Sequence, residues 1–83
     1  MKTVQISLNS IDKVKSFVNA ITQYEYDFDL ISGRYVIDAK SIMGIFSLDL
    51  SKPIDLAIHA ENNMDEIMET LKPYLSLIHI SEP

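Results

Sequence analysis

The sequence predicts a two-layer α+β domain, in which strands form one layer and helices cover one face of that layer. Three observations support this fold class. Short segments that alternate apolar and polar residues with a period of two are typical of half-buried strands. Two longer segments space their apolar residues three and four positions apart, as amphipathic helices do. Together with one short apolar run, they give the order strand, helix, strand, strand, short helix, strand, helix.

The first strand and the first long helix are expected before residue 23. The strand is predicted by three apolar residues that alternate with polar ones: Val4, Ile6 and Leu8. Asn9, with Asp12 three residues later, supplies a capping residue and an acid suited to the first turn of a helix. We expect this helix to run from about Ser10 to Thr22, with its apolar residues at helical spacing: Ile11, Val14, Phe17, Val18 and Ile21.

A hairpin follows the first helix. Its first strand is predicted by the alternating residues Tyr26, Phe28 and Leu30, and Ser32-Gly33 is a turn signal. The inward residues of its second strand are either Tyr35 and Ile37 or, alternatively, Val36.

The second half of the chain predicts two more helices and one strand. The apolar run 39–48 is interrupted by Gly44, so we expect a helix of one or two turns, capped by Ser41. The fourth strand is predicted by Ile54, Leu56 and Ile58. Asn63 with Glu66 resembles a capping box that opens a last helix, and Pro73 should end or distort it. The apolar residues of that helix are Met64, Ile67, Met68 and Leu71.

Composition narrows the function classes. The chain has 83 residues, enough for one domain with a thin core. Its formal charge of −5 argues against binding to nucleic acid or to an anionic membrane, since both require a basic patch. The absence of cysteine excludes disulfides and thiolate chemistry. With no spanning segment and no signal peptide in view, we expect a cytoplasmic protein. No nucleophile–base pair or metal cluster is visible, so we expect neither enzymatic activity nor a metal or cofactor.

The last nine residues, 75–83, read Leu-Ser-Leu-Ile-His-Ile-Ser-Glu-Pro. They resemble the conceptual translation of a transposon-type sequencing-library adapter over their full length. We therefore expect the domain to occupy residues 1–74 and residues 75–83 to be a non-native tail, which excludes His79 from any functional argument. The alternative is a natural apolar extension.

The run 39–48, Ala-Lys-Ser-Ile-Met-Gly-Ile-Phe-Ser-Leu, is similar to the segment around the regulatory serine of HPr proteins from Gram-positive bacteria. HPr is the histidine-containing phosphocarrier protein of the bacterial sugar phosphotransferase system. The resemblance extends from about Lys2 to Leu71. It implies an HPr-like open-faced sandwich: a four-stranded antiparallel sheet with helices on one face, in the order βαββαβα.

The resemblance fails at residues 7–15. In the family, a histidine just before the first long helix takes the phosphoryl group, and an arginine and a proline follow it. The corresponding stretch 8–15, Leu-Asn-Ser-Ile-Asp-Lys-Val-Lys, contains none of the three, and Asp12 would repel a phosphate. Ser10 is expected to cap the helix. His59 should point away from the core, far from the helix start.

Four residues carry the functional expectations that the resemblance implies. Ser41 corresponds to the serine that HPr kinase phosphorylates, although its simpler role is to cap the short helix. The other three correspond to an exposed apolar contact patch for partner proteins: Ile42, Met43 and Phe46. Alternatively these side chains cover the core; Ile42 and Ile45 would then be buried with Met43 and Phe46 exposed, or the reverse.

The expected function is that of a regulatory or adaptor homologue of HPr without phosphohistidine transfer. Its partners would be proteins of the phosphotransferase system or of its regulation, including HPr kinase. Two alternatives remain open: a genuine phosphocarrier, as the family label implies, and a plain protein-interaction module.

Overall fold

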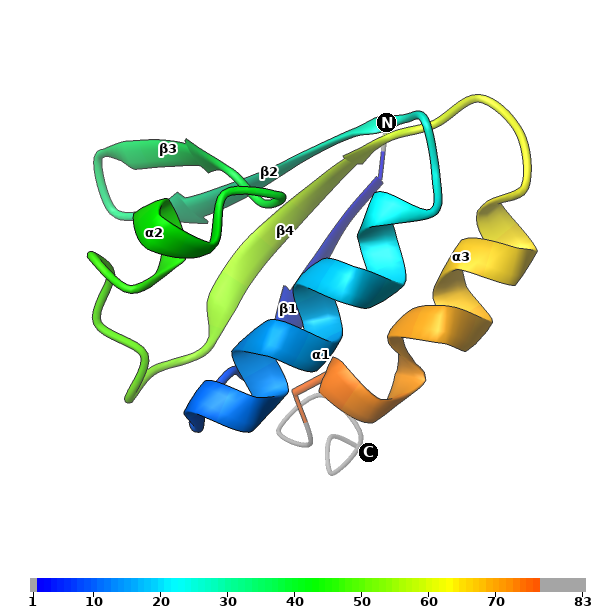
Figure 1. Ribbon diagram of the computed structural model, residues 1–83. Helices are drawn as coiled ribbons and strands as arrows, with labels where there is room; N and C mark the ends of the chain where they lie inside the picture. Colours follow the sequence, from blue (N-terminus) through cyan, green and yellow to red (C-terminus); the bar gives the residue numbers. More distant parts are fainter. Residues whose placement is uncertain (1, 77–83) are drawn as a thin grey trace, which may run out of the picture.

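A four-stranded antiparallel sheet and the helices on one of its faces form the two layers of the computed structural model, which describes residues 2–76 (Figure 1). The strands are β1 (Lys2–Ile6), β2 (Asp27–Ser32), β3 (Tyr35–Asp38) and β4 (Ile54–His59). The helices are α1 (Ile11–Thr22), α2 (Ile42–Ile45) and α3 (Met64–Leu71). The order βαββαβα and the α+β fold class are confirmed.

The strand order in the sheet is β1-β4-β2-β3, so β4 lies between β1 and β2. Ile6 pairs with Ile54 and Lys2 with Ile58, and on the other side of β4 Phe28 pairs with Ile58. Because side chains alternate along a strand, this register turns Ile54, Leu56 and Ile58 toward the helices. The intervening residues of β4 lie on the open face of the sheet, which no helix covers (Figure 1).

The core lies between the sheet and the two long helices. Val14, Phe17 and Ile21 are the buried residues of α1, and Ile67 and Leu71 are those of α3. The Phe17 ring meets the ring of Tyr74 edge to face, with centroids 5.6 Å apart. Two hydroxyl contacts join the helical layer: Ser16 with Tyr74, and Tyr24 with Thr70 at 2.8 Å. The middle of α1 and the turn that follows it are therefore fastened to the segment that runs from α3 to Tyr74.

The structure shows where the apolar side chains at the start of α1 and along β3 lie. Ile11 falls at helical spacing with buried residues of α1, yet it is 62 % exposed, because it opens the first turn of the helix at the end of the two layers. In β3, Ile37 is half-buried and pairs with Leu30, whereas Tyr35 and Val36 are exposed. The inward residue of β3 is thus Ile37 alone.

The capping box predicted for α3 is wrong. Asn63 takes left-handed backbone angles, with φ at 62°, and its side chain makes no capping hydrogen bond. Its amide nitrogen instead donates to the Tyr26 hydroxyl at 3.3 Å. Asparagine tolerates this backbone region better than other residues with a Cβ, so the residue serves as a turn rather than as a cap.

The segment after α3 returns to the sheet. The helix ends at Leu71 and a 3₁₀ turn, Lys72–Tyr74, contains Pro73, as expected for a proline that cannot continue a helix. Leu75 then bridges to Ile6 of β1. Of the predicted tail, Leu75 and Ser76 are thus described, and residues 77–83, which include His79, lie outside the described residues.

Candidate functional site

The start of α1 is built around a serine. Ser10 has extended backbone angles, and its hydroxyl oxygen accepts a hydrogen bond from the backbone N–H of Lys13 at 3.1 Å. This is the geometry of an N-cap, which satisfies one of the free donors at a helix start. Ser10, and not Asn9, is therefore the capping residue, and it is the residue immediately before the first helix.

Helix α2 is capped in the same way by Ser41. Its hydroxyl oxygen accepts from the backbone N–H of Gly44 at 3.3 Å, and the residue is exposed. Ile45 is buried and Ile42 half-buried, whereas Met43 is 79 % and Phe46 42 % exposed. Of the two arrangements that the sequence allowed, the structure has Ile42 and Ile45 toward the core and Met43 and Phe46 toward solvent.

The start of α1 and the segment after α2 lie next to one another. A shallow groove is lined by residues 9–11 at the start of α1 and by Phe46, Leu50 and Ser51 after α2. We call the residues Ser10, Ile11, Ser41, Met43 and Phe46 the α1–α2 surface. The sequence analysis did not single out Ile11 as a member, because helical spacing shows only that it shares a helix with Val14 and Phe17.

The loop after α2 is ordered by a local turn. The Asp49 carboxylate accepts from the hydroxyl of Ser51 at 2.6 Å and from its backbone N–H at 3.1 Å. These two bonds, the hydroxyl first, hold the pKa of Asp49 below its usual value. The turn fixes the position of Leu50 and Ser51, and so one wall of the groove.

Lys40, the cation next to Ser41 in the sequence, is already engaged. Its ammonium donates to the backbone carbonyl of Tyr24 at 2.8 Å and lies 5.8 Å from the centre of the Phe28 ring. A phosphate on Ser41 would therefore meet the helix N–H groups before it met a free lysine.

His59 lies at the other end of the sheet from the start of α1. Ile54, the first residue of β4, pairs with Ile6 near that start, and His59 is five residues further along the strand, about 17 Å away. The ring is on the open face, where Nε2 lies 2.9 Å from a carboxylate oxygen of Asp29. Figure 1 shows the two places at opposite ends of the molecule.

Other kinds of site find no support within residues 2–76. No three side chains of the metal-binding types come together there, and Asp27 and Asp29 stand on the open face of β2 without a third ligand. In the same range, no helix has the length and apolar character needed to cross a membrane.

Gly44 allows α2 to approach β3 closely. A Cβ at this position would lie 2.6 Å from Cγ2 of Ile37 and 3.2 Å from the Ser41 hydroxyl oxygen. We expect Gly44→Ala to lower the free energy of unfolding by about 1–3 kcal/mol, because α2 must move away from the sheet. Urea unfolding followed by circular dichroism measures this.

Gly33→Ala is the matched control for that substitution. Gly33 has a φ of 61° and open space around it, so its variant should lose about 1 kcal/mol through the backbone alone and leave the α2 resonances in place. A Gly44→Ala protein with unchanged α2 chemical shifts and unchanged stability would contradict the close approach.

Known proteins share the sequence pattern and the fold of this chain. Residues 13–76 match the family model described as the PTS HPr component phosphorylation site. The fold is similar to the crystal structure of HPr-C-His from Thermoanaerobacter tengcongensis, with a TM-score of 0.71 and 24 % sequence identity over 95 % of this chain and 92 % of that one. No match was found among curated proteins. Since the family match covers most of the sequence, the chain belongs to the HPr family of phosphocarrier proteins of the phosphotransferase system.

Proposed function

We propose that this chain is a regulatory or adaptor member of the HPr family that does not relay phosphoryl groups through histidine. One observation carries the proposal: the residue immediately before α1 is Ser10, whose hydroxyl caps the helix, and the only histidine of the described chain lies at the far end of β4. A phosphoserine is an ordinary ester, so Ser10 offers no replacement for a phosphorylated imidazole. The family match itself begins at residue 13, after the stretch concerned.

The α1–α2 surface supports a role in binding partner proteins. Its three apolar members, Ile11, Met43 and Phe46, are among the large apolar side chains that the chain exposes. Ile11 and Phe46 line one groove, and apolar area exposed in this way is typical of an interaction site. Met43 is the most exposed of the three, and methionine adapts to partners of different shape. The resemblance to HPr supports this role for Ile42, Met43 and Phe46, with proteins of the phosphotransferase system and its regulation as the partners.

Ser41 is the proposed regulatory site. Its hydroxyl is exposed and stands at a helix start, where a phosphate would add a charge of about −1.5 to −2 without requiring the helix to unfold. That charge would lie beside Met43, so phosphorylation would change the binding surface rather than the fold.

HPr kinase with ATP is expected to label this protein on a single residue. Ser41→Ala should abolish the label. Ser10→Ala is the matched control, because it removes the other serine whose hydroxyl caps a helix, and it should leave the label in place. Each variant should lose about 0.5–2 kcal/mol of stability through its lost cap, so both must be checked for folding. Label that survives in the Ser41→Ala protein would contradict the assignment.

A plain interaction module without phosphorylation is the second candidate. The exposed Met43 favours it, since this side chain is available whether or not Ser41 is modified. If kinase leaves the protein unlabelled and Met43→Glu still disrupts capture of a partner, this second function replaces the first.

We also propose that the HPr-like domain occupies residues 1–74 and that residues 75–83 are a non-native tail. The support is the resemblance of these nine residues to a translated sequencing adapter. Resequencing the intact flanking DNA tests it: a natural gene that encodes the same nine residues would show that they are native.

A further inference from the structure

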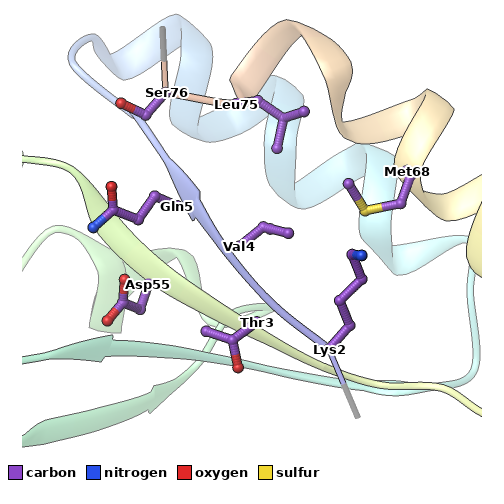
Figure 2. Close-up of a pocket in the computed structure, with 8 residues that line it drawn as sticks. All are labelled: Lys2, Thr3, Val4, Gln5, Asp55, Met68, Leu75 and Ser76. Atoms are coloured by element: carbon purple, nitrogen blue, oxygen red, sulfur yellow. The ribbon is translucent and has the colours of Figure 1, made fainter. Parts of the chain in front are cut away.

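The two edges of the sheet differ in what borders them. Part of the outer side of β1 is bordered by the segment after α3, where the backbone N–H of Ser76 donates to the carbonyl of Gln5 at 3.0 Å. Figure 2 shows Leu75 and Ser76 beside this strand. β3 forms the opposite edge, and within residues 2–76 no strand pairs with its outer side (Figure 1). A strand edge in this state can pair with another strand.

The backbone groups of Val36, in the middle of β3, face this outer edge. The N–H of Ala39, just after β3, donates to the carbonyl of Phe28 at 2.8 Å, so these two residues form a hydrogen-bonded pair. Such pairs alternate with non-hydrogen-bonded pairs along an antiparallel ladder. Ile37 is therefore bonded to β2, whereas Val36 and Asp38 turn their backbone groups away from β2.

The side chains along the outer edge of β3 are open to solvent. Tyr35 is 69 % and Val36 65 % exposed, and Arg34 and Asp38 are exposed as well. Neither of these two charged residues forms an ion pair within residues 2–76. The edge therefore offers two large apolar side chains between a free cation and a free anion.

This sequence is complementary to itself when two copies run antiparallel. From Arg34 to Asp38 it reads Arg-Tyr-Val-Ile-Asp. If Val36 lies opposite its counterpart in a second copy, Arg34 lies opposite Asp38. Tyr35 then lies opposite Ile37, and each of these pairs occurs twice because the arrangement is two-fold symmetric. Opposite charges, and an aromatic with a β-branched residue, are favourable cross-strand pairs.

The backbone allows the same register. Two opposite residues of an antiparallel pair exchange hydrogen bonds only if both turn their backbone groups toward the other strand. Val36 does so in both copies, so it can bond twice to its counterpart. A shift by one residue would place Val36 opposite Ile37, whose backbone groups are bonded to β2. The charges and the backbone, two separate observations, thus favour one register.

We propose that the outer edge of β3 is a self-association site, at which two copies of this chain pair their β3 strands antiparallel across a two-fold axis at Val36. The two sheets then form one continuous sheet. The contact is small, so the dimer is weak and depends on concentration. The inference goes beyond the proposed function and does not depend on it.

Sedimentation equilibrium of the full chain tests the proposal. The weight-average mass should rise above that of the monomer as the concentration approaches about 1 mM, the range in which weak complexes form. Val36→Lys places two like charges opposite one another at the axis and should raise the Kd at least about tenfold. Thr3→Lys is the matched control, because Thr3 is an exposed β-branched residue of the other edge strand, and its side chain turns away from Met68 and Leu75 (Figure 2). It should leave the Kd unchanged.

Two charge variants test the register. Arg34→Asp brings the introduced aspartate opposite Asp38 of the second copy, and Asp38→Arg brings the introduced arginine opposite Arg34. Each variant alone should raise the Kd at least about tenfold. A mixture of the two should associate as the parent does, because both charged pairs of the mixed dimer again join opposite charges. ¹⁵N-labelled Arg34→Asp protein should then show a shift of its Val36 amide resonance when unlabelled Asp38→Arg protein is added.

Folding of the Asp38→Arg protein must be checked by circular dichroism, because the Asp38 carboxylate accepts a hydrogen bond from the backbone N–H of Lys40 at 2.9 Å. If this variant does not fold, Val36→Lys against Thr3→Lys decides the question. Three results would overturn the proposal: a parent that stays monomeric at about 1 mM, equal effects of Val36→Lys and Thr3→Lys, or folded charge variants that associate no better mixed than alone.

Discussion

Incubation with phosphoenolpyruvate and the first enzyme of the phosphotransferase system should leave this protein without acid-labile phosphate. The reaction needs an imidazole nitrogen beside the start of α1, where the helix N–H groups stabilise the phosphoryl charge. That position holds Ser10, whose oxygen is bound to the N–H of Lys13, and Asp12 in the first turn adds a repelling charge. Radiolabel from phosphoenolpyruvate, followed by acid treatment, measures the outcome; a normal HPr treated in parallel should be fully labelled.

Two variants make this result decisive. Ser10→His with Asp12→Arg restores an imidazole and a cation at the start of α1, and we expect it to gain some label. His59→Gln removes the histidine at the end of β4 and should behave as the parent does. If the parent protein is labelled with acid-labile phosphate and His59→Gln is not, the ring of His59 reaches the first enzyme. That result would contradict the proposal that this chain does not carry phosphoryl groups.

Phe17→Ala should come close to unfolding the domain. The Phe17 side chain is fully buried between the layers and meets Tyr74 edge to face. Removal of a buried phenylalanine ring costs about 3–5 kcal/mol, because transfer energy is lost and a cavity remains. A domain of this size is stable by only about 4–11 kcal/mol. Urea unfolding monitored by circular dichroism should show a midpoint that falls by roughly half.

Phe46→Ala is the matched control, because the same atoms are removed from a ring that is 42 % exposed on the α1–α2 surface. We expect its cost to stay below about 1 kcal/mol. It should weaken partner binding instead, so the two variants separate the ring that holds the layers together from the ring offered to partners. Equal loss of stability in both would contradict that division.

Periodicity predicted the architecture well, for a physical reason. Burial of one face imposes a period of two on the apolar residues of strands and of 3.6 on those of helices. Phe28, Leu56 and Ile67 follow these periods and are buried. Periodicity could not predict that Ile11 is exposed, because spacing reports which face of a helix a residue is on but not where the opposing layer ends. The capping-box motif failed at Asn63, whose backbone is set by the path of the turn between β4 and α3 rather than by the helix that follows.

The α1–α2 surface could be predicted only in pieces. Ser41, Met43 and Phe46 stood out because of their local motif, and Ser10 because a helix begins there. Their neighbourhood depends on tertiary packing: Phe46 reaches the groove at the start of α1 because Gly44 lets α2 lie against Ile37. Nothing in the local sequence encodes the distance between two segments that lie about 35 positions apart.

The position of β4 also governs the order in which the molecule can assemble. β1 is made first, yet its only strand partner between residues 2 and 59 is β4, which starts 48 positions after β1 ends. A chain emerging from the ribosome can close the β2–β3 hairpin early, but β1 must wait until Ile54–His59 has been synthesised. Pairings of such long sequence separation slow folding. An N-terminal fragment that stops before residue 54 should therefore remain without a sheet core, however well its helix is capped.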